Sequence, residues 1–315
     1  MLRLVLAMLV TAACGRAQGV ADEDLGDLVV APKQVETKID VARAASEPAE
    51  LGRALTTPHR KFIAGLGPHV VSIAGSTIVD EAGKAVTELS ERTTLELGAG
   101  DVFRGVYTNT QDYGREVTFV DGSLYLRPRY QRWHKRAPET TDEPHDLRDS
   151  FVLPIAAVWD LLAPGVELTD QGATDVAGRS GRKIAIKQSP RPAKPPAETL
   201  VQRKWREGRT VEDVTGEIVL DVETGAPLST KLSGTVGFMR DGRRFRMKLS
   251  VTSAISDIGK PAAITAPATE EVVTTPERLR EVDERDYLLQ GIAPPLRKNP
   301  DGTAVTPTLP KAEDK

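Results

Sequence analysis

The fold is decided by three successive amphipathic segments, GEIVLDV (residues 216–222), APLSTKLSGTVGFM (226–239) and RFRMKLSVTSAI (244–255). Apolar residues recur at every second position in each segment, which is the period of a β-strand with one buried and one solvated face. The residues between the segments, Glu223–Gly225 and Asp241-Gly242, are typical of hairpin turns. The segments therefore predict an antiparallel sheet with one side toward the interior and the other toward water.

Strand-like runs also precede this stretch. The same period of two appears in HVVSIAGSTIVD (69–80), VTELSERTTLELG (86–98) and VFRGVYTNTQDY (102–113). A hairpin follows, with EVTFV (116–120) and SLYLR (123–127) joined by Asp121-Gly122, a strong signal for a two-residue turn. RKIAIKQ (182–188) reads as a further strand, and the proline-rich stretch 189–198 reads as an exposed loop.

One segment between the strands has helical rather than strand spacing. Apolar residues at 147, 151, 155, 158, 161 and 162 fit one face of a helix. Pro154 should kink or restart that helix, and Pro164-Gly165 should end it. Trp159 lies on the same stretch and is expected to anchor it in the core.

The amino terminus has the order of an export signal. Residues 1–13, MLRLVLAMLVTAA, contain Arg3, an unbroken apolar run and then small residues, and the chain's only cysteine, Cys14, follows directly. The segment VTAACG resembles the lipobox of bacterial lipoproteins, although Thr11 stands where Leu is usual. That resemblance implies cleavage before Cys14, acylation of its thiol with fatty acids such as palmitate, and attachment to the periplasmic face of the outer membrane. An ordinary signal peptide with an incidental cysteine is the alternative.

The composition of the rest of the chain predicts where its domains begin and end. Residues 14–64 are predicted to form a flexible tether that can contain one short amphipathic helix, and residues 65–268 to form the β domain. Residues 269–315 are predicted to hold a helix, starting near Pro276, and a disordered tail.

A family resemblance rests on the run from Gly216 to Pro267. A strand is followed by DVETGAPL, by two long amphipathic strands and by SDIGKPAAITAP, and this order resembles the carboxyl-terminal half of LolA/LppX-like periplasmic proteins. The hairpin at 116–127, followed by Trp133 and then a helix, is similar to the middle of the same plan. The resemblance covers about residues 65–268, and the loop at 189–198 departs from it as an insertion. It implies an α+β fold, with a strongly curved antiparallel half-barrel and helices across its concave face.

The resemblance also implies a function. Proteins of this family carry lipoproteins or glycolipids with the acyl chains in an apolar cavity, so a lipid or acylated ligand is expected here. The residues expected to line the cavity are Leu220, Leu232, Val236, Phe238, Phe245, Met247, Leu249, Val251 and Trp159. Each of these residues can equally be ordinary core. A structural or assembly lipoprotein that contacts envelope protein partners without a ligand is the second hypothesis.

Other chemistry finds no support in the sequence. The four histidines are not spaced for a metal-binding helix, and no GxSxG, phosphate-binding or dinucleotide motif is present, so neither a cofactor, a metal nor an enzymatic activity is expected. A net charge of −3 does not indicate a nucleic-acid partner. The basic stretch RPRYQRWHKR (127–136) could stack on nucleic acid or touch lipid headgroups. A solvated strand with Tyr130 and Trp133 packed on the sheet is favoured, because export makes nucleic acid improbable.

Overall fold

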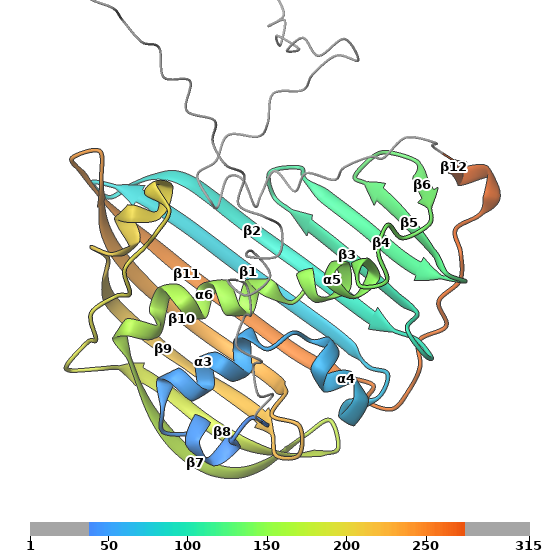
Figure 1. Ribbon diagram of the computed structural model, residues 1–315. Helices are drawn as coiled ribbons and strands as arrows, with labels where there is room; N and C mark the ends of the chain where they lie inside the picture. The colour runs from blue at the N-terminus through green and yellow to red at the C-terminus, as the bar shows by residue number, and fades with distance from the viewer. Residues whose placement is uncertain (1–37, 275–315) are drawn as a thin grey trace, which may run out of the picture. The chain divides into compact units, whose positions relative to one another are not determined.

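The computed structural model describes residues 38–274, and its folded body begins at Ile39. The body is built on one open sheet of twelve strands in the order β12-β6-β5-β4-β3-β2-β1-β11-β10-β9-β8-β7 (Figure 1). Neighbouring strands pair antiparallel except β12 and β6, which pair parallel. The strands are β1 Val70–Glu81, β2 Lys84–Leu97, β3 Phe103–Asn109, β4 Gly114–Val120, β5 Ser123–Pro128, β6 Trp133–Arg136, β7 Val166–Val176, β8 Arg179–Gln188, β9 Thr210–Asp221, β10 Pro227–Arg240, β11 Arg243–Ser256 and β12 Val272–Thr274.

The helices lie on one face of this curved sheet (Figure 1). They are α2 Val41–Ala44, α3 Pro48–Thr56, α4 Arg60–Leu66, α5 Glu143–Ser150 and α6 Leu153–Leu162, with short 3₁₀ turns η1 Ala163–Gly165, η2 Val201–Arg206 and η3 Thr269–Glu271. The predicted α+β half-barrel with helices across its concave face is confirmed. The helix expected around Pro154 is present in two parts, and α6 starts with that proline in its first turn.

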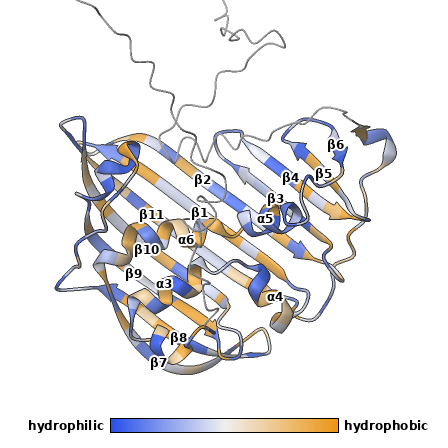
Figure 2. Ribbon diagram, in the orientation of Figure 1, coloured by the Kyte–Doolittle hydropathy of each residue, from blue (hydrophilic) through white to orange (hydrophobic). Residues whose placement is uncertain are grey.

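The strand pattern gives the sheet two different faces. Along β10 the even-numbered residues from 228 to 238 are buried toward the helices, while Ser229, Lys231 and Ser233 lie on the opposite, solvated face. Figure 2 shows this alternation of hydrophobic and hydrophilic positions along the strands. The predicted turns at Asp121-Gly122 and Asp241-Gly242 both have positive φ at both residues, as a tight hairpin requires.

Three features differ from the sequence-based expectation. The stretch from Ile39 to Leu66, expected to be tether with one short helix, forms three helices whose residues Ala44, Leu51 and Phe62 are buried in the core. β7 was not predicted, because its residues are mostly polar and it lies at the edge of the sheet. Val222, expected on the apolar face, lies beyond the end of β9 and is 51% exposed. The predicted helix near Pro276 lies outside the described residues.

Helix α6 approaches the sheet closely because glycines lie beneath it. A Cβ at Gly105 of β3 would overlap the ring of Phe151, the residue between α5 and α6. A Cβ at Gly234 of β10 would lie 2.7 Å from Leu162 at the end of α6. Phe151 and Leu162 are almost fully buried, so their rings and methyl groups have little room to move. Because Gly105 and Gly234 have no side chains, the helix layer can lie this close to the sheet.

Gly105→Ala should lower the free energy of unfolding by about 1–3 kcal/mol, because the new methyl group overpacks the buried Phe151 ring. Urea unfolding measures the change. Gly208→Ala is the matched control, since the nearest atom to its Cβ is 4.0 Å away and no loss is expected. In the double variant Gly105→Ala/Phe151→Leu the two losses should be less than additive. Full additivity would show that the two residues do not interact.

Candidate functional site

An apolar patch lies on the concave face between α6 and the hairpins β1–β2 and β10–β11. Strand register places Val79 opposite Met247, Thr77 opposite Leu89, and Phe245 opposite Glu81. Val79, Leu89, Phe245 and Met247 are each half-buried, unlike the fully buried core residues further along the same strands. We call these four residues the concave patch. Met247 packs against the hydrophobic core, and the other three lie beside it on the same face.

The patch ends in a row of three aromatic rings. Phe245 of β11 stacks on Phe238 of β10 with 5.6 Å between ring centroids, and Phe238 packs against Trp205 of η2 at 4.4 Å. Trp205 is half-buried, whereas Trp133 and Trp159 are buried elsewhere in the body. The row extends the apolar surface from β1 across β11 and β10 to the segment 201–206.

Polar groups border the concave patch on two sides. Glu91 of β2 lies next to Gly75 and accepts a hydrogen bond of 2.9 Å from the Tyr107 hydroxyl. Glu81, at the end of β1, forms an ion pair of 3.2 Å with Arg243. The apolar surface is therefore bounded by charged groups that already have partners.

The residues predicted to line a cavity fall into two groups. Seven are buried by the protein's own helices and strands, namely Leu220, Leu232, Val236, Phe238, Leu249, Val251 and Trp159. Phe245 and Met247 are the two with accessible surface, and both belong to the concave patch. Ligand contact at these positions stays a prediction. Val79, Leu89 and Trp205 were not identified. The first two lie in runs recognised as strands, but nothing in the sequence shows which strands become neighbours, and Trp205 follows a loop without any periodicity.

A buried arginine fixes the end of α6 next to this surface. Arg209 is 3% exposed and donates hydrogen bonds to the carbonyl oxygens of Asp160 (2.8 Å) and Leu161 (3.1 Å) at the carboxyl end of the helix. A cation at this end also interacts favourably with the helix dipole. Arg206 forms ion pairs with Asp160 and Glu198 in the same place. The segment that carries Trp205 is thereby tied to α6.

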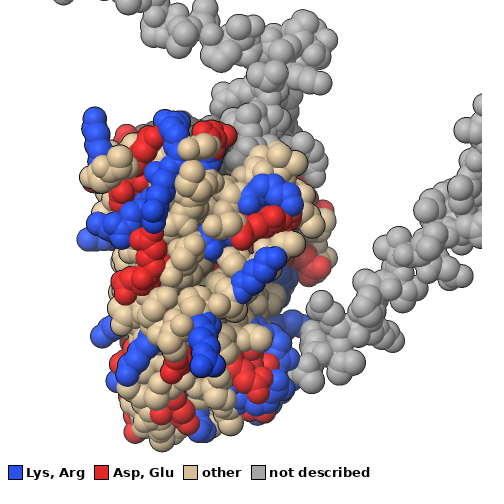
Figure 3. Space-filling view, turned by 90° about the vertical axis from the view of Figure 1, so that its left-hand side faces the viewer, with Lys and Arg blue, Asp and Glu red and all other residues tan. Residues whose placement is uncertain are grey.

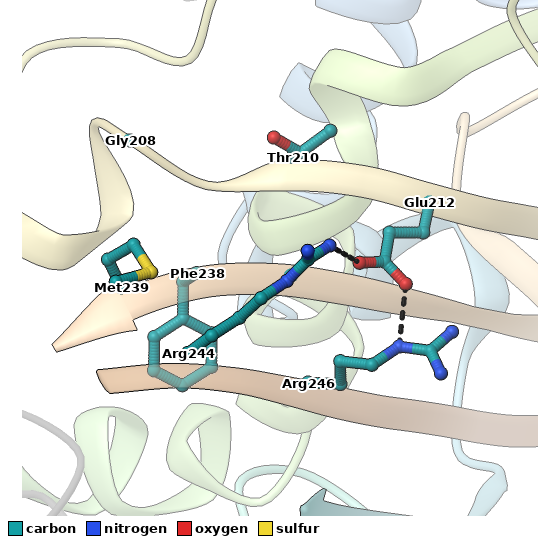
Figure 4. Close-up of a pocket in the computed structure, with 8 residues that line it drawn as sticks. Gly208, Thr210, Glu212, Phe238, Met239, Arg244 and Arg246 are labelled. Atoms are coloured by element: carbon teal, nitrogen blue, oxygen red, sulfur yellow. Dashed lines mark hydrogen bonds and ion pairs between the residues drawn. The ribbon is translucent and has the colours of Figure 1, made fainter. Parts of the chain in front are cut away.

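A hollow lies on the opposite face of the sheet from the concave patch (Figure 4). It is an open basin of about 770 Å³ over the ends of β9, β10 and β11. Glu212 of β9 reaches across Gly237 of β10 to pair with Arg244 (3.3 Å) and Arg246 (2.7 Å) of β11. A Cβ at Gly237 would collide with the Glu212 carboxylate, so this crossing requires glycine. One carboxylate is shared by two guanidinium groups, which leaves the basin positively charged.

In the basic stretch 127–136, the expectation of aromatic residues packed on the sheet holds for Trp133 and not for Tyr130. Trp133 of β6 is 5% exposed and carries the Arg127 guanidinium over its ring at 4.5 Å, as a packed aromatic residue on a strand would. Tyr130 was expected to pack beside it, but it lies in a turn with positive φ and is 77% exposed. The turn points its ring away from the sheet, and the ring contacts Arg129 at 4.9 Å.

Two histidines form a buried pair where α4 meets β1. His69 Nδ1 donates to the Gly67 carbonyl oxygen at 2.7 Å, so its Nε2 carries no proton and accepts a hydrogen bond of 2.8 Å from His59 Nε2. His59 is 4% exposed and His69 fully buried. Burial, together with the nearby His69 and Arg148, lowers the pKa of His59 to about 3. Burial also lowers the pKa of His69. Both rings are therefore neutral at pH 7, and their role is structural.

Neither a metal cluster nor a membrane helix is found in residues 38–274. No three His, Cys, Asp or Glu side chains in that range converge as metal ligands would. None of the described helices has the length and apolar character needed to cross a bilayer.

The chain has similar solved structures. Lipoprotein LppX from Mycobacterium tuberculosis is 14% identical, with 70% of this chain and 100% of that chain covered and a TM-score of 0.28. LprF from Mycobacterium bovis is 16% identical, with 71% and 99% covered and a TM-score of 0.27. A putative outer membrane lipoprotein-sorting protein domain from Vibrio parahaemolyticus is 12% identical, with 70% and 93% covered and a TM-score of 0.19. No family model and no curated protein sequence matches.

Stability should fall as the pH drops from 7 to 5, because of the histidine pair. The unfolded chain binds protons at its histidines below about pH 6.5, whereas folded His59 stays neutral down to about pH 3. The unfolded state then holds more protons, so the free energy of unfolding should decrease by up to about 1.4 kcal/mol per pH unit for His59, and His69 acts in the same direction. Urea unfolding at pH 7, 6 and 5 measures this slope.

His59→Gln should flatten the slope between pH 7 and 5 while also lowering stability at pH 7. His134→Gln is the control, since His134 lies outside the pair. An unchanged slope in His59→Gln would contradict the assignment. The ordinary pKa values of carboxylates lie near 4, below this window. Burial raises the pKa of Asp149, which acts in the opposite direction and is common to all the variants.

Proposed function

We propose that this protein is a lipid-anchored protein of the cell envelope that binds the acyl chain of an amphiphile on its concave patch. The observation that carries the proposal is the half-buried state of Val79, Leu89, Phe245 and Met247 on the face whose apolar residues are fully buried further along the same strands. These residues lie side by side on three adjacent strands. An acyl chain laid along them completes the cover that α3 and α6 give to the other half of the sheet.

The energetics of the patch favour an apolar ligand. Burial of apolar surface contributes about 25 cal/mol per Å², so each 100 Å² covered by a chain contributes about 2.5 kcal/mol. Trp205 and Phe245, joined by the buried Phe238 between them, add flat, rigid surface on which methylene groups can pack. A polar ligand would gain little here, because the charged groups at the border are already paired.

The anchor is proposed from the sequence alone. Cys14 follows an apolar run and small residues, and it lies outside the described residues. A free exposed thiol is reactive, whereas an acylated cysteine is inert and holds the chain at a bilayer. The location in the envelope and the binding of an amphiphile are then consistent with each other.

Quenching of Trp205 by a brominated fatty acid tests the binding site. Because Trp205 adjoins the patch, 9,10-dibromostearate should quench part of the tryptophan emission of the full chain. The saturable quenching should disappear in Trp205→Phe. Val79→Asp should weaken binding at least about tenfold, or about 1.4 kcal/mol, since it places a charge where the chain packs.

Ile78→Asp is the matched control for Val79→Asp. Ile78 is the neighbouring residue on β1, is also half-buried and lies on the opposite face of the sheet. It should leave the affinity for dibromostearate unchanged. If both variants bind equally well, or if the quenching persists without Trp205, the concave patch is not the binding site.

Incorporation of labelled palmitate tests the anchor. Bacteria that express the full chain should incorporate the label into it, and Cys14→Ser should abolish the label and release the protein from the membrane fraction. Thr11→Leu, which restores the usual lipobox residue, should keep the label. Equal labelling of Cys14→Ser would exclude acylation at this residue.

A further inference from the structure

We propose that the end of the sheet next to the concave patch docks on the surface of a bilayer that contains anionic lipid. The docking edge consists of the β1–β2 turn (82–86), the segment 200–204, and the β10–β11 end from Met239 to Arg246. This proposal goes beyond ligand binding and does not depend on it. It assigns a role to exposed side chains that neither the fold nor the concave patch explains.

The three segments of the docking edge are neighbours in space. Arg243 of the β10–β11 end pairs with Glu81 at the start of the β1–β2 turn at 3.2 Å. The 3₁₀ turn η2, which contains most of the segment 200–204, is held against β10 by the contact between Trp205 and Phe238 at 4.4 Å. The edge is therefore one continuous surface assembled from distant parts of the chain.

Exposed apolar side chains concentrate on this edge. Of the seven large hydrophobic residues that are exposed in the described part of the chain, four lie here: Val86 (51%), Leu200 (41%), Val201 (79%) and Met239 (53%). Single exposed apolar residues are common on any protein, but a group of them on one edge marks a contact with an apolar environment.

The edge is also positively charged. The stretch from Arg240 to Arg246 contains four arginines and one aspartate. Arg244 and Arg246 share the single carboxylate of Glu212, so one positive charge there stays uncompensated within the basin. Arg203 and Lys204 lie in the adjoining segment, where Lys204 pairs with Glu207 at 2.7 Å. Lys and Arg side chains project at the upper end of the face that carries these hairpins (Figure 3).

Isolated apolar side chains flanked by arginines match the chemistry of a bilayer surface. The arginines can lie among phosphate headgroups while their neighbours enter the acyl boundary, as in amphipathic interfacial segments. A protein partner would instead need a contiguous apolar core in the interface. On this edge the apolar residues stand at the tips of separate segments. When the edge is docked in this way, the concave patch lies next to the lipid headgroups.

Vesicle sedimentation tests the docking edge. The full chain should be used with Cys14→Ser in every arm, so that no acyl anchor contributes and the amino-terminal segment is common to all arms. Vesicles of phosphatidylcholine with phosphatidylglycerol should sediment the protein, and phosphatidylcholine alone should bind it at least about tenfold more weakly. Added salt should reduce the binding, because exposed charges are screened.

Two double variants, each with a matched control, separate the contribution of the arginines from that of the apolar residues. Arg240→Ser/Arg243→Ser should weaken binding to the anionic vesicles at least about tenfold, whereas Lys187→Ser/Lys231→Ser, which removes two exposed cations elsewhere on the sheet, should not. Val201→Ser/Met239→Ser should weaken binding as well, with Leu153→Ser/Val222→Ser as the matched apolar control.

Three outcomes would overturn the proposal. The first is equal binding of the chain to neutral and anionic vesicles. The second is that the control variants lose as much vesicle binding as the docking-edge variants. The third is that the chain self-associates through this edge and does not bind vesicles. The dibromostearate experiment is independent, so failure of docking and failure of acyl-chain binding can be told apart.

Discussion

The apolar face of an open sheet must be covered, because each 100 Å² left in water costs about 2.5 kcal/mol. This sheet does not close, since β7 and β12 stand at its two edges and do not pair with each other. Helices α3 and α6 pack over β7 and β9–β11, and fully buried side chains continue along the face to Leu95 of β2 and Phe103 of β3. Toward the β1–β2 and β10–β11 hairpins the same face carries half-buried residues. The boundary between covered and accessible surface is what gives the protein a candidate site.

The position of α6 determines where the covered surface ends. Contacts beneath the helix and at its carboxyl end fix that position. From below, Gly105 and Gly234 let Phe151 and Leu162 approach the strands. From its carboxyl end, the buried Arg209 binds the last carbonyl groups of the helix. Neither contact would hold alone, since a short helix gains little stability without tertiary packing.

The sequence predicts the strands well and their partners poorly. Alternation identifies β1, β2, β9, β10 and β11, because each has one buried face, and Asp-Gly dipeptides locate two turns. The pairing of β1 with β11 joins residues about 170 positions apart, and no local pattern contains that information. Helices α2–α4 are too short to show a clear helical period in the sequence, and burial of Ala44, Leu51 and Phe62 depends on tertiary packing. β7 has a polar edge strand's composition and resembles a loop.

The candidate site illustrates the same limit more sharply. Alternation on β11 predicts that Phe245, Met247, Leu249 and Val251 all lie on the apolar face. It cannot show which of them are covered by a helix and which stay accessible. That difference comes from α6, whose end point depends on an arginine 47 residues further along the chain. Trp205 joins the site through the same arginine-rich segment. Function in an open half-barrel is therefore decided less by the strands, which the sequence reveals, than by the extent of the layer placed over them.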